Sequence, residues 1–343
     1  MASSTMKAWQ YTAISGGQLE KSINLTTSVT PPALSSLCRG QVLIKVITAA
    51  INPVDYKIPE LAFLRKLMIT LPAIPGLDFC GRVVGTHPSS NDTLKEGQLV
   101  FGALNKAAKF GSLGQFIVIS SDECAPLPEG IEPDHAAAAG IAALTAYQSY
   151  PRNIVKPGSK VFINGGSGGT GTFGIQFAKA LGAEVTVTCS TGNIELCRSL
   201  GADEVLDYKK IDILSELKNK GQVFDLAVDN AASPASLYER SGAFLKKGGK
   251  FMQVGVHLSF SGMGSAFSRP LRPAFLGGGN RAFHFVRVSS NRKDLREIGK
   301  LMAEGRVKAV IDEVFEFEDV PRAYEKLRAG HAKGKIVVHV TEK

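Results

Sequence analysis

The chain has 343 residues, with 40 lysine and arginine residues against 31 aspartate and glutamate residues and a net charge of +9. At about 100–200 residues per domain, this length predicts two domains. A hydrophobic share of 44% with 21% charged residues excludes a disordered chain. We expect no membrane-spanning helix, because no apolar run reaches about 18 residues. We expect no secretory signal, because residues 1–17 lack an apolar core with a basic flank.

The cysteines and the positive charge bear on compartment and partners. The five cysteines are scattered without a C-x-x-C pair, which favours a reducing, cytoplasmic compartment. The charge is typical of a solvated basic surface. Attraction to a phosphorylated cofactor or to an acidic membrane face stays open, because lysine and arginine are spread along the chain. We expect no nucleic-acid partner, since neither an aromatic-basic nor a helix-turn-helix pattern is present.

The first 125 or so residues contain short runs rich in β-branched and aromatic residues. Clusters of glycine and proline, such as Ile74-Pro75-Gly76, stand between these runs. This spacing favours a closed or rolled β-structure. The predicted strands cover residues 41–50, 79–85, 98–103 and 115–120.

From about residue 128 the pattern becomes an alternation of strands and helices, beginning with a helical segment of small residues at 134–150. Such an alternation is typical of a parallel sheet with right-handed crossovers. The predicted strands are 160–164, 184–188, 225–229 and 250–254, with another near Val205, and the predicted helices are 170–181 and 194–200.

The C-terminal tail has a different pattern, with helices predicted at 294–304 and 320–329 and a strand at 335–340. Strong β-formers follow Gly334, and we expect this strand to return to the first β-unit. The predicted domains are therefore residues 1–127 with 286–343, and residues 128–285.

The strongest local motif lies between the strand at 160–164 and the helix that follows it. Gly166, Gly168 and Gly171 match the pattern G-x-G-x-x-G. The pattern has meaning here because it follows an apolar strand and opens a helix. Glycine allows a tight turn and lets the backbone approach a pyrophosphate, which the free N–H groups of the helix N-terminus can bind. The motif predicts a dinucleotide site, with a purely structural glycine turn as the alternative.

The end of the second strand bears on which dinucleotide binds. A site for NAD usually places an acidic residue there to bind the ribose 2′-hydroxyl, but residues 185–194 contain none. The hydroxyl groups of Ser190 and Thr191 can instead donate hydrogen bonds to a 2′-phosphate, with Tyr208 as a further contact. We therefore predict NADPH rather than NADH, although this loop lacks the expected arginine or lysine. Alternatively, Ser190 and Thr191 only cap the next helix.

Metal and hydrolase motifs are absent from the sequence. None of the six histidines stands in an H-x-x-x-H pattern or near a pair of cysteines, so no zinc-ligand spacing is present. A G-x-S-x-G elbow is also missing, which argues against an α/β-hydrolase. We predict no metal site.

The sequence resembles a known protein family in five places. These are the three segments at residues 50–57, 74–84 and 140–147, the glycine motif, and residues 201–208. Their order is similar to that of the zinc-free quinone oxidoreductase branch of the medium-chain dehydrogenase/reductase superfamily. This branch includes zeta-crystallin-like and plant enone oxidoreductase proteins. The resemblance covers nearly the whole chain and implies an α/β fold. It implies a GroES-like catalytic domain of β-barrel type and a Rossmann cofactor domain with a doubly wound parallel sheet.

The differences from zinc-containing relatives are informative. Those relatives place cysteine where Asn52 stands and a His-Glu pair where Leu77 and Asp78 stand, and they carry a four-cysteine lobe after the second segment. This sequence has no cysteine in that region. A zinc-bound alkoxide would lack its Lewis acid here, so the resemblance implies hydride delivery to an acceptor that is already polarised.

The resemblance also assigns roles to individual residues. It implies that Asn52, Tyr56 and Lys57 are catalytic and line the nicotinamide end of the cofactor and the substrate pocket. Asn193 stands where relatives often carry lysine. The motif and the resemblance together imply that the cofactor-binding residues are Lys57, Thr145, Gly166, Gly168, Gly169, Thr170, Gly171, Ser190, Thr191, Asn193, Tyr208, Asn230, Val254, Gly255 and Phe285.

The proposed catalytic residues also have structural interpretations. Asn52 and Asp55 can cap a turn or a helix. Tyr56 can be a core aromatic residue, and Lys57 can be a solvated charge.

We therefore predict an NADPH-dependent enzyme that transfers hydride to a quinone or to the β-carbon of an α,β-unsaturated carbonyl. One alternative is an enoyl reductase for a tethered biosynthetic intermediate, in which Arg269 and Arg272 of a lid at residues 260–279 meet a carrier protein. Another is a membrane-surface or structural protein that retains a cofactor site. The homodimer common in the family stays open.

Overall fold

The computed structural model describes residues 5–89, 93–106, 109–254 and 280–342 and divides the chain into two compact units. The first comprises Met1–Leu144 and Ser289–Lys343, and the second comprises Thr145–Val288. These boundaries differ from those predicted, because residues 128–144 belong to the first unit and residues 286–288 to the second. Within residues 128–144, the helix α3 (Pro133–Ala138) packs on the sheet of the first unit.

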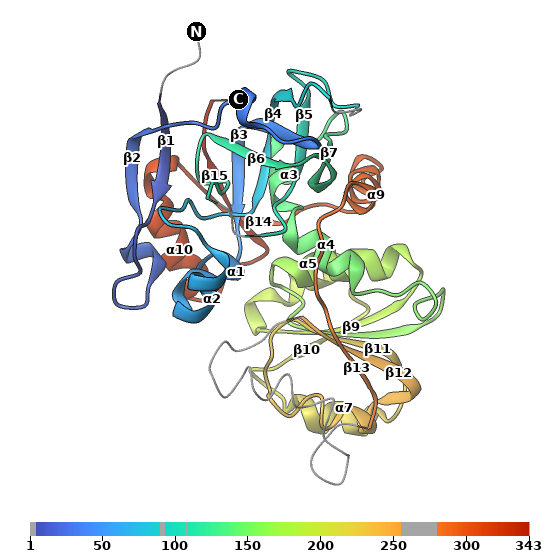
Figure 1. Cartoon of the computed structure of the whole chain (residues 1–343). Helices are drawn as coiled ribbons and strands as arrows, with labels where there is room; N and C mark the ends of the chain where they lie inside the picture. The colour runs from blue at the N-terminus through green and yellow to red at the C-terminus, as the bar shows by residue number, and fades with distance from the viewer. Residues whose placement is uncertain (1–4, 90–92, 107–108, 255–279, 343) are drawn as a thin grey trace. The chain divides into compact units, whose positions relative to one another are not determined.

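The first unit is built on a seven-stranded sheet (Figure 1). Its strands are β3 (Gln41–Ile51), β4 (Asp78–Thr86), β5 (Leu99–Ala103), β6 (Phe116–Ser120), β7 (Cys124–Pro126), β14 (Ile311–Phe315) and β15 (Lys335–His339). The long strand β3 is central and mostly buried, since it pairs antiparallel with β4 and also with β6 and β15. In the pairing with β15, Ile336 lies opposite Ile51, so the tail returns to this unit as expected.

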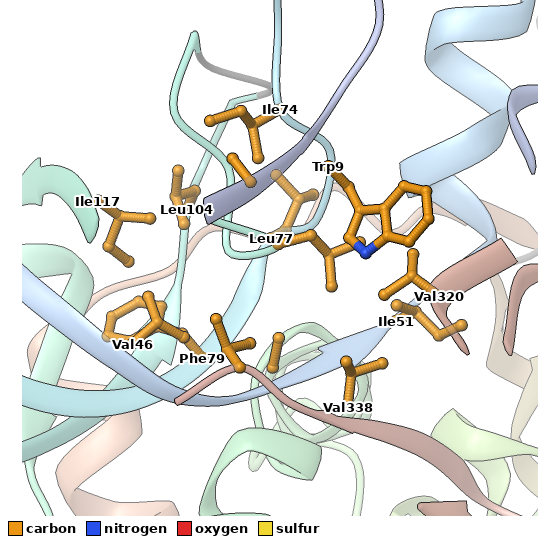
Figure 2. Packing of buried hydrophobic residues seen from close by; sticks show 14 of the residues in the cluster. Trp9, Val46, Ile51, Ile74, Leu77, Phe79, Leu104, Ile117, Val320 and Val338 are labelled. Carbon is orange, nitrogen blue, oxygen red and sulfur yellow. The ribbon is translucent and has the colours of Figure 1, made fainter. Parts of the chain in front are cut away.

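Other elements accompany this sheet in the same unit. They are the two-stranded sheet of β1 (Met6–Gln10) and β2 (Asn24–Val29), and the helices α1 (Pro53–Glu60), α2 (Ala62–Met68), α9 (Arg292–Ala303) and α10 (Val320–Arg328). Figure 2 shows part of the core, in which residues from the start and the end of the chain pack together. Trp9 packs in this core, and its indole N–H donates to the Phe317 carbonyl over 2.6 Å. The tail is therefore an integral part of the unit.

The helix predicted at 134–150 is two helices in the structure, α3 and α4 (Ile141–Gln148). They are separated at Gly140, where a Cβ would overlap the carboxylate of Asp78. The single-helix prediction was wrong because this buried side chain approaches the backbone there.

The second unit contains a six-stranded parallel sheet in the order β10-β9-β8-β11-β12-β13. In order of occurrence along the chain this is 3-2-1-4-5-6, the doubly wound order of dinucleotide-binding folds. The strands are β8 (Lys160–Asn164), β9 (Glu184–Cys189), β10 (Glu204–Asp207), β11 (Phe224–Asp229), β12 (Leu245–Gln253) and β13 (Ala282–Phe285). The crossover helices include α5 (Gly169–Ala180), α6 (Ile194–Ser199) and α7 (Ile213–Lys220).

The strand order places a topological switch point between β8 and β11. In open sheets of this kind, ligands bind outside the carboxyl ends of the strands at such a point. The fold therefore directs attention to the loops that follow β8 and β11. None of the helices within the described ranges is sufficiently long and apolar to span a bilayer.

Candidate active site

The glycine motif forms a tight turn between β8 and α5. Gly165 has a φ of +80°, and the N–H of Gly166 donates to the Thr188 carbonyl of β9 over 2.8 Å. A Cβ on Gly171 would overlap the carbonyl oxygen of Gly165 and lie 2.8 Å from the Cα of Gly166. The helix can begin directly against the strand end only because Gly171 has no side chain.

The N-terminus of α5 is open to a ligand at its first residues. Gly168 is the N-cap residue, and no side chain caps the helix there. A Cβ on Gly168 would have no neighbour closer than 4.0 Å. Helix N-terminal N–H groups with an accessible backbone are suited to bind phosphate. Of the predicted residues, Gly168, Gly169 and Thr170 lie at this helix start.

Polar residues at the carboxyl ends of the three central strands form a buried network that sequence reasoning missed. Asn164 of β8 donates to Asp229 of β11 over 2.8 Å, and Gln253 of β12 donates to the other oxygen of Asp229 over 3.0 Å. Burial raises the pKa of Asp229. The signal available in the sequence was a polar residue at the end of each apolar strand.

Asn230 directly follows this network. Its Oδ1 is buried and has no hydrogen-bond partner in the described part of the chain. A buried carbonyl oxygen without a partner is costly. Asn230 thus presents an unused acceptor beside the switch point, which fits a residue that meets a ligand.

The loop after β9 differs from the expectation drawn from its sequence. Thr191 donates its hydroxyl proton to Asp207 of β10 over 2.6 Å, so an acidic group lies beside a loop that has none of its own. This hydrogen bond holds the pKa of Asp207 below its ordinary value. Asn193 donates to Ser190 Oγ over 3.2 Å and to Ser167 Oγ over 3.0 Å. The hydroxyl groups of this loop are thus partly engaged within the protein.

Tyr208 and two lysines follow β10 directly. The Tyr208 side chain is 49% exposed, and the Lys209 ammonium lies 5.6 Å from the centre of its ring. Lys209 and Lys210 also lower the pKa of Asp207 by their charge. Together they supply the positive charge that the loop after β9 lacks.

The remaining predicted cofactor residues of this unit are dispersed. Val254 follows β12 and donates its N–H to the Asp229 carbonyl over 2.9 Å, and Phe285 ends the neighbouring strand β13. Because the strands are parallel, both residues lie at the carboxyl ends of the strands, as the glycine turn does. Thr145 is buried on α4. Gly255 and the predicted lid at residues 260–279 lie outside the described residues.

In the first unit, Asn52 is buried at the start of α1. Its Nδ2 donates to Asp78 Oδ2 over 2.8 Å, and its Oδ1 accepts from Lys335 over 2.5 Å. The other oxygen of Asp78 accepts from the Ile141 N–H over 2.7 Å. Sequence reasoning singled out Asn52 and Asp78 as replaced zinc-ligand positions but did not find Lys335.

Asp55 also caps α1, as its structural interpretation predicted. Its Oδ2 accepts from the Asn52 N–H over 2.7 Å. Its Oδ1 is buried without a partner in the described ranges. Burial, together with the nearby charge of Asp78, raises the pKa of Asp55 to about 8.

Tyr56 and Lys57 follow on the same helix. The Tyr56 ring packs on the core of the unit and under the Arg328 guanidinium, which lies 4.3 Å from the ring centre and pairs with Glu20 and Glu60. Burial raises the pKa of Tyr56 and lowers that of Lys57. The core interpretation of Tyr56 thus holds for its ring, while Lys57 is half-buried and not a fully solvated charge.

The predicted residues therefore fall into two groups, one on each unit. In the second unit the glycine turn presents the N-terminus of α5, and in the first unit Asn52 lies in a buried hydrogen-bond network at the start of α1. Within the part of the chain that the structure describes, three or more histidine, cysteine or acidic side chains do not gather into a potential metal site.

Comparison with known proteins shows which family the chain resembles. The family model described as alcohol dehydrogenase GroES-like domain matches residues 38–129, and the model described as zinc-binding dehydrogenase matches residues 200–338. The trans-enoyl reductase pgmF of Aspergillus terreus is 44% identical over 349 residues, which cover 99% of this chain and 97% of that protein. The chloroplastic NADPH-dependent alkenal/one oxidoreductase of Arabidopsis thaliana is 32% identical over 343 residues, covering 97% and 79%.

A solved structure of an oxidoreductase is also similar to this chain over nearly its whole length. The quinone oxidoreductase from Coxiella burnetii matches with a TM-score of 0.83 and 27% identity, over 98% of this chain and 100% of that one. The chain belongs to the medium-chain dehydrogenase/reductase family. Within that family it is an oxidoreductase similar to enoyl, enone and quinone reductases.

We expect Gly171→Ala to lower the free energy of unfolding by about 1–3 kcal/mol, because the new Cβ overlaps backbone atoms that cannot move aside. Helix propensity alone gives the opposite sign, a gain of about 1 kcal/mol. Gly168→Ala is the matched control, and we expect it to change stability by less than about 0.5 kcal/mol. Denaturant unfolding measures both, and equal stability of the two variants contradicts the packing role of Gly171.

We expect stability to depend on the protonation of Asp55. The pKa of Asp55 is about 8 in the folded chain against an ordinary value of 3.8. The folded state therefore holds the proton more tightly, and this contribution to stability is lost as the pH rises from about 4 to 8. Asp55→Asn keeps an acceptor for the Asn52 N–H and removes the titration. Stability curves of wild type and variant should diverge over that range and run parallel above pH 8, whereas parallel curves throughout contradict the raised pKa.

Proposed function

We propose that the protein is an NADPH-dependent reductase that transfers hydride to the β-carbon of an α,β-unsaturated carbonyl or to a quinone, without a metal. The observation that carries the proposal is the glycine turn at the switch point, with an uncapped helix N-terminus and the unpartnered Oδ1 of Asn230 beside it. These groups are suited to hold the pyrophosphate and its neighbouring ribose. When bound, the reduced nicotinamide supplies the hydride.

The preference for NADPH is supported by charge at the end of β10. Residues 185–194 carry no acid, and the nearby Asp207 carboxylate is engaged by Thr191. We propose that Ser190, Tyr208 and Lys209 contact the 2′-phosphate, because Lys209 brings positive charge close to the exposed Tyr208 side chain. Lys210 adds to the same field.

The first unit is proposed to stabilise the charge that develops on the substrate. Hydride addition to the β-carbon drives negative charge onto the carbonyl oxygen, and a hydrogen-bond donor near that oxygen stabilises the enolate. The raised pKa keeps Tyr56 protonated, and the lowered pKa of Lys57 makes its proton easier to release. Either residue, or Asn52, can donate a hydrogen bond to the oxygen. Tyr56, Lys57 or water then delivers a proton to the α-carbon of the enolate.

Loss of one donor should impair turnover rather than abolish it, because one such group typically contributes about 10²–10³ in rate. We also propose that the reaction requires no metal. The Asn52 amide and the Lys335 ammonium donate to Asp78, at positions where zinc-containing relatives place their ligands.

A second candidate concerns the acceptor. The 44% identity with a trans-enoyl reductase over 99% of this chain favours an enoyl group as the acceptor. In this second candidate, a carrier protein presents that group. The hydride chemistry is the same in both cases. The difference lies in whether the acyl chain arrives free or tethered.

The test uses purified protein, NADPH and a panel of quinones, enals, enones and enoyl thioesters. We expect the absorbance of the reduced nicotinamide to fall with at least one class, and deuterium from C4-deuterated NADPH to appear at the β-carbon. Faster turnover of an enoyl thioester on a carrier protein than on a small thiol favours the second candidate. The proposal is contradicted if no acceptor in the panel is reduced.

We expect the double variant Lys209→Ala, Lys210→Ala to weaken NADPH binding by about tenfold or more, because charge-assisted hydrogen bonds contribute about 1.5–3 kcal/mol. Binding of NADH should change by less than about twofold, since it has no 2′-phosphate. Lys246→Ala is the matched control, because Lys246 lies at the amino end of β12, whereas Lys209 and Lys210 follow the carboxyl end of β10. Lys246 pairs with Asp225 over 2.7 Å. Calorimetry measures the affinities, and an equal effect on both dinucleotides contradicts the assignment.

A further inference from the structure

Lys335 is a buried lysine whose charge is completely enclosed. It begins strand β15, and its side chain is 3% exposed. An ammonium group has three donors, and all three have partners here: the Ile51 carbonyl over 3.1 Å, Asn52 Oδ1 over 2.5 Å and Asp78 Oδ2 over 3.0 Å. Burial of a charge is costly unless it is paired and hydrogen-bonded in this way.

Lys335 and Asp78 together hold the Asn52 side chain at both ends of its amide. The Oδ1 accepts from the ammonium, and the Nδ2 donates to the Asp78 carboxylate over 2.8 Å. A rotation of the amide by half a turn would place its NH₂ against the ammonium and its oxygen against the carboxylate. Both contacts would then be repulsive, so the orientation of the amide is determined. Of the two Nδ2 protons, Asp78 uses one.

Asp78 is itself held in place. It is completely buried, and its other oxygen accepts from the Ile141 N–H over 2.7 Å at the start of α4. Gly140 leaves the space that this carboxylate fills, because a Cβ there would overlap it. The carboxylate therefore receives donors from α1, α4 and β15, and it cannot move without breaking several hydrogen bonds.

We infer that Lys335 is a positioning residue that, through Asn52, fixes the direction of the N–H donor offered to the substrate carbonyl oxygen. This inference rests on the proposed function, in which Asn52 is one of the donors to that oxygen. A merely structural ion pair could be replaced by apolar groups without loss. The Lys335–Asp78 pair instead holds the amide of Asn52. This residue stands at the start of the helix that carries Tyr56 and Lys57.

The first test compares Lys335→Met with the control Lys326→Met. Lys326 pairs with Asp312 and Glu313 at the surface of the same unit. We expect Lys335→Met to lower kcat by about 10²-fold, because misplacement of a catalytic group has an effect of this size. The KM should change by less than about threefold, since the donor acts mainly in the transition state. The control should keep the wild-type kcat, and NADPH affinity should stay unchanged in both variants.

The second test asks whether Lys335 acts through Asn52. Two groups that act as one unit give non-additive losses. In an Asn52→Ala background, Lys335→Met should therefore lower kcat by less than about twofold further. Multiplied losses in the double variant would overturn the inference. So would a Lys335→Met protein with reduced thermal stability and unchanged kcat per folded molecule.

A final variant separates folding from positioning. If Lys335→Met alone does not fold, Lys335→Met with Asp78→Asn removes both charges and keeps an acceptor for the Ile141 N–H. We expect this pair to fold, as the buried charge is no longer unpaired, and to remain about 10²-fold slower. Recovery of wild-type kcat overturns the inference and leaves the proposed function intact. A wild-type protein that reduces no acceptor overturns both.

Discussion

The close approach of helix α5 to the end of strand β8 is the constraint on which the proposed cofactor site depends. Two backbone segments meet there at a distance that no side chain would allow, since a Cβ on Gly171 would overlap Gly165. This approach exposes helix N–H groups at the switch point of the sheet. Asn230 and Val254 follow neighbouring strands at the same edge, so their place also depends on the parallel order around β8.

The first unit uses a different principle, the enclosure of opposite charges. Asp78 and Lys335 are both buried, and each is surrounded by hydrogen-bond partners. Such a pair contributes little net stability compared with apolar packing, but loss of one partner is costly, about 3–5 kcal/mol. Its value in this protein is geometric, because it gives a single orientation to an amide beside the proposed donors.

Local patterns in the sequence were sufficient for the parallel sheet and the glycine turn, but not for the boundaries of the two units. The sheet and the turn depend on residues that are close together along the chain, such as the apolar strand before Gly166 and the helix after it. Other features depend on long-range packing and left only weak signals. Lys335 lies 283 residues from Asn52, and Asp207 reaches Thr191 from a neighbouring strand. The break at Gly140 was missed for the same reason, since it depends on a carboxylate from β4.

The most direct measurement of the central claim is the change in backbone amide NMR signals when NADPH is added to the ¹⁵N-labelled protein. The account predicts the largest shifts at Gly168, Gly169 and Thr170, with further shifts at Asn230 and at Tyr208. NADH should shift the first four residues and leave Tyr208 nearly unchanged. Unchanged signals at the start of α5 upon saturation with NADPH would contradict the account.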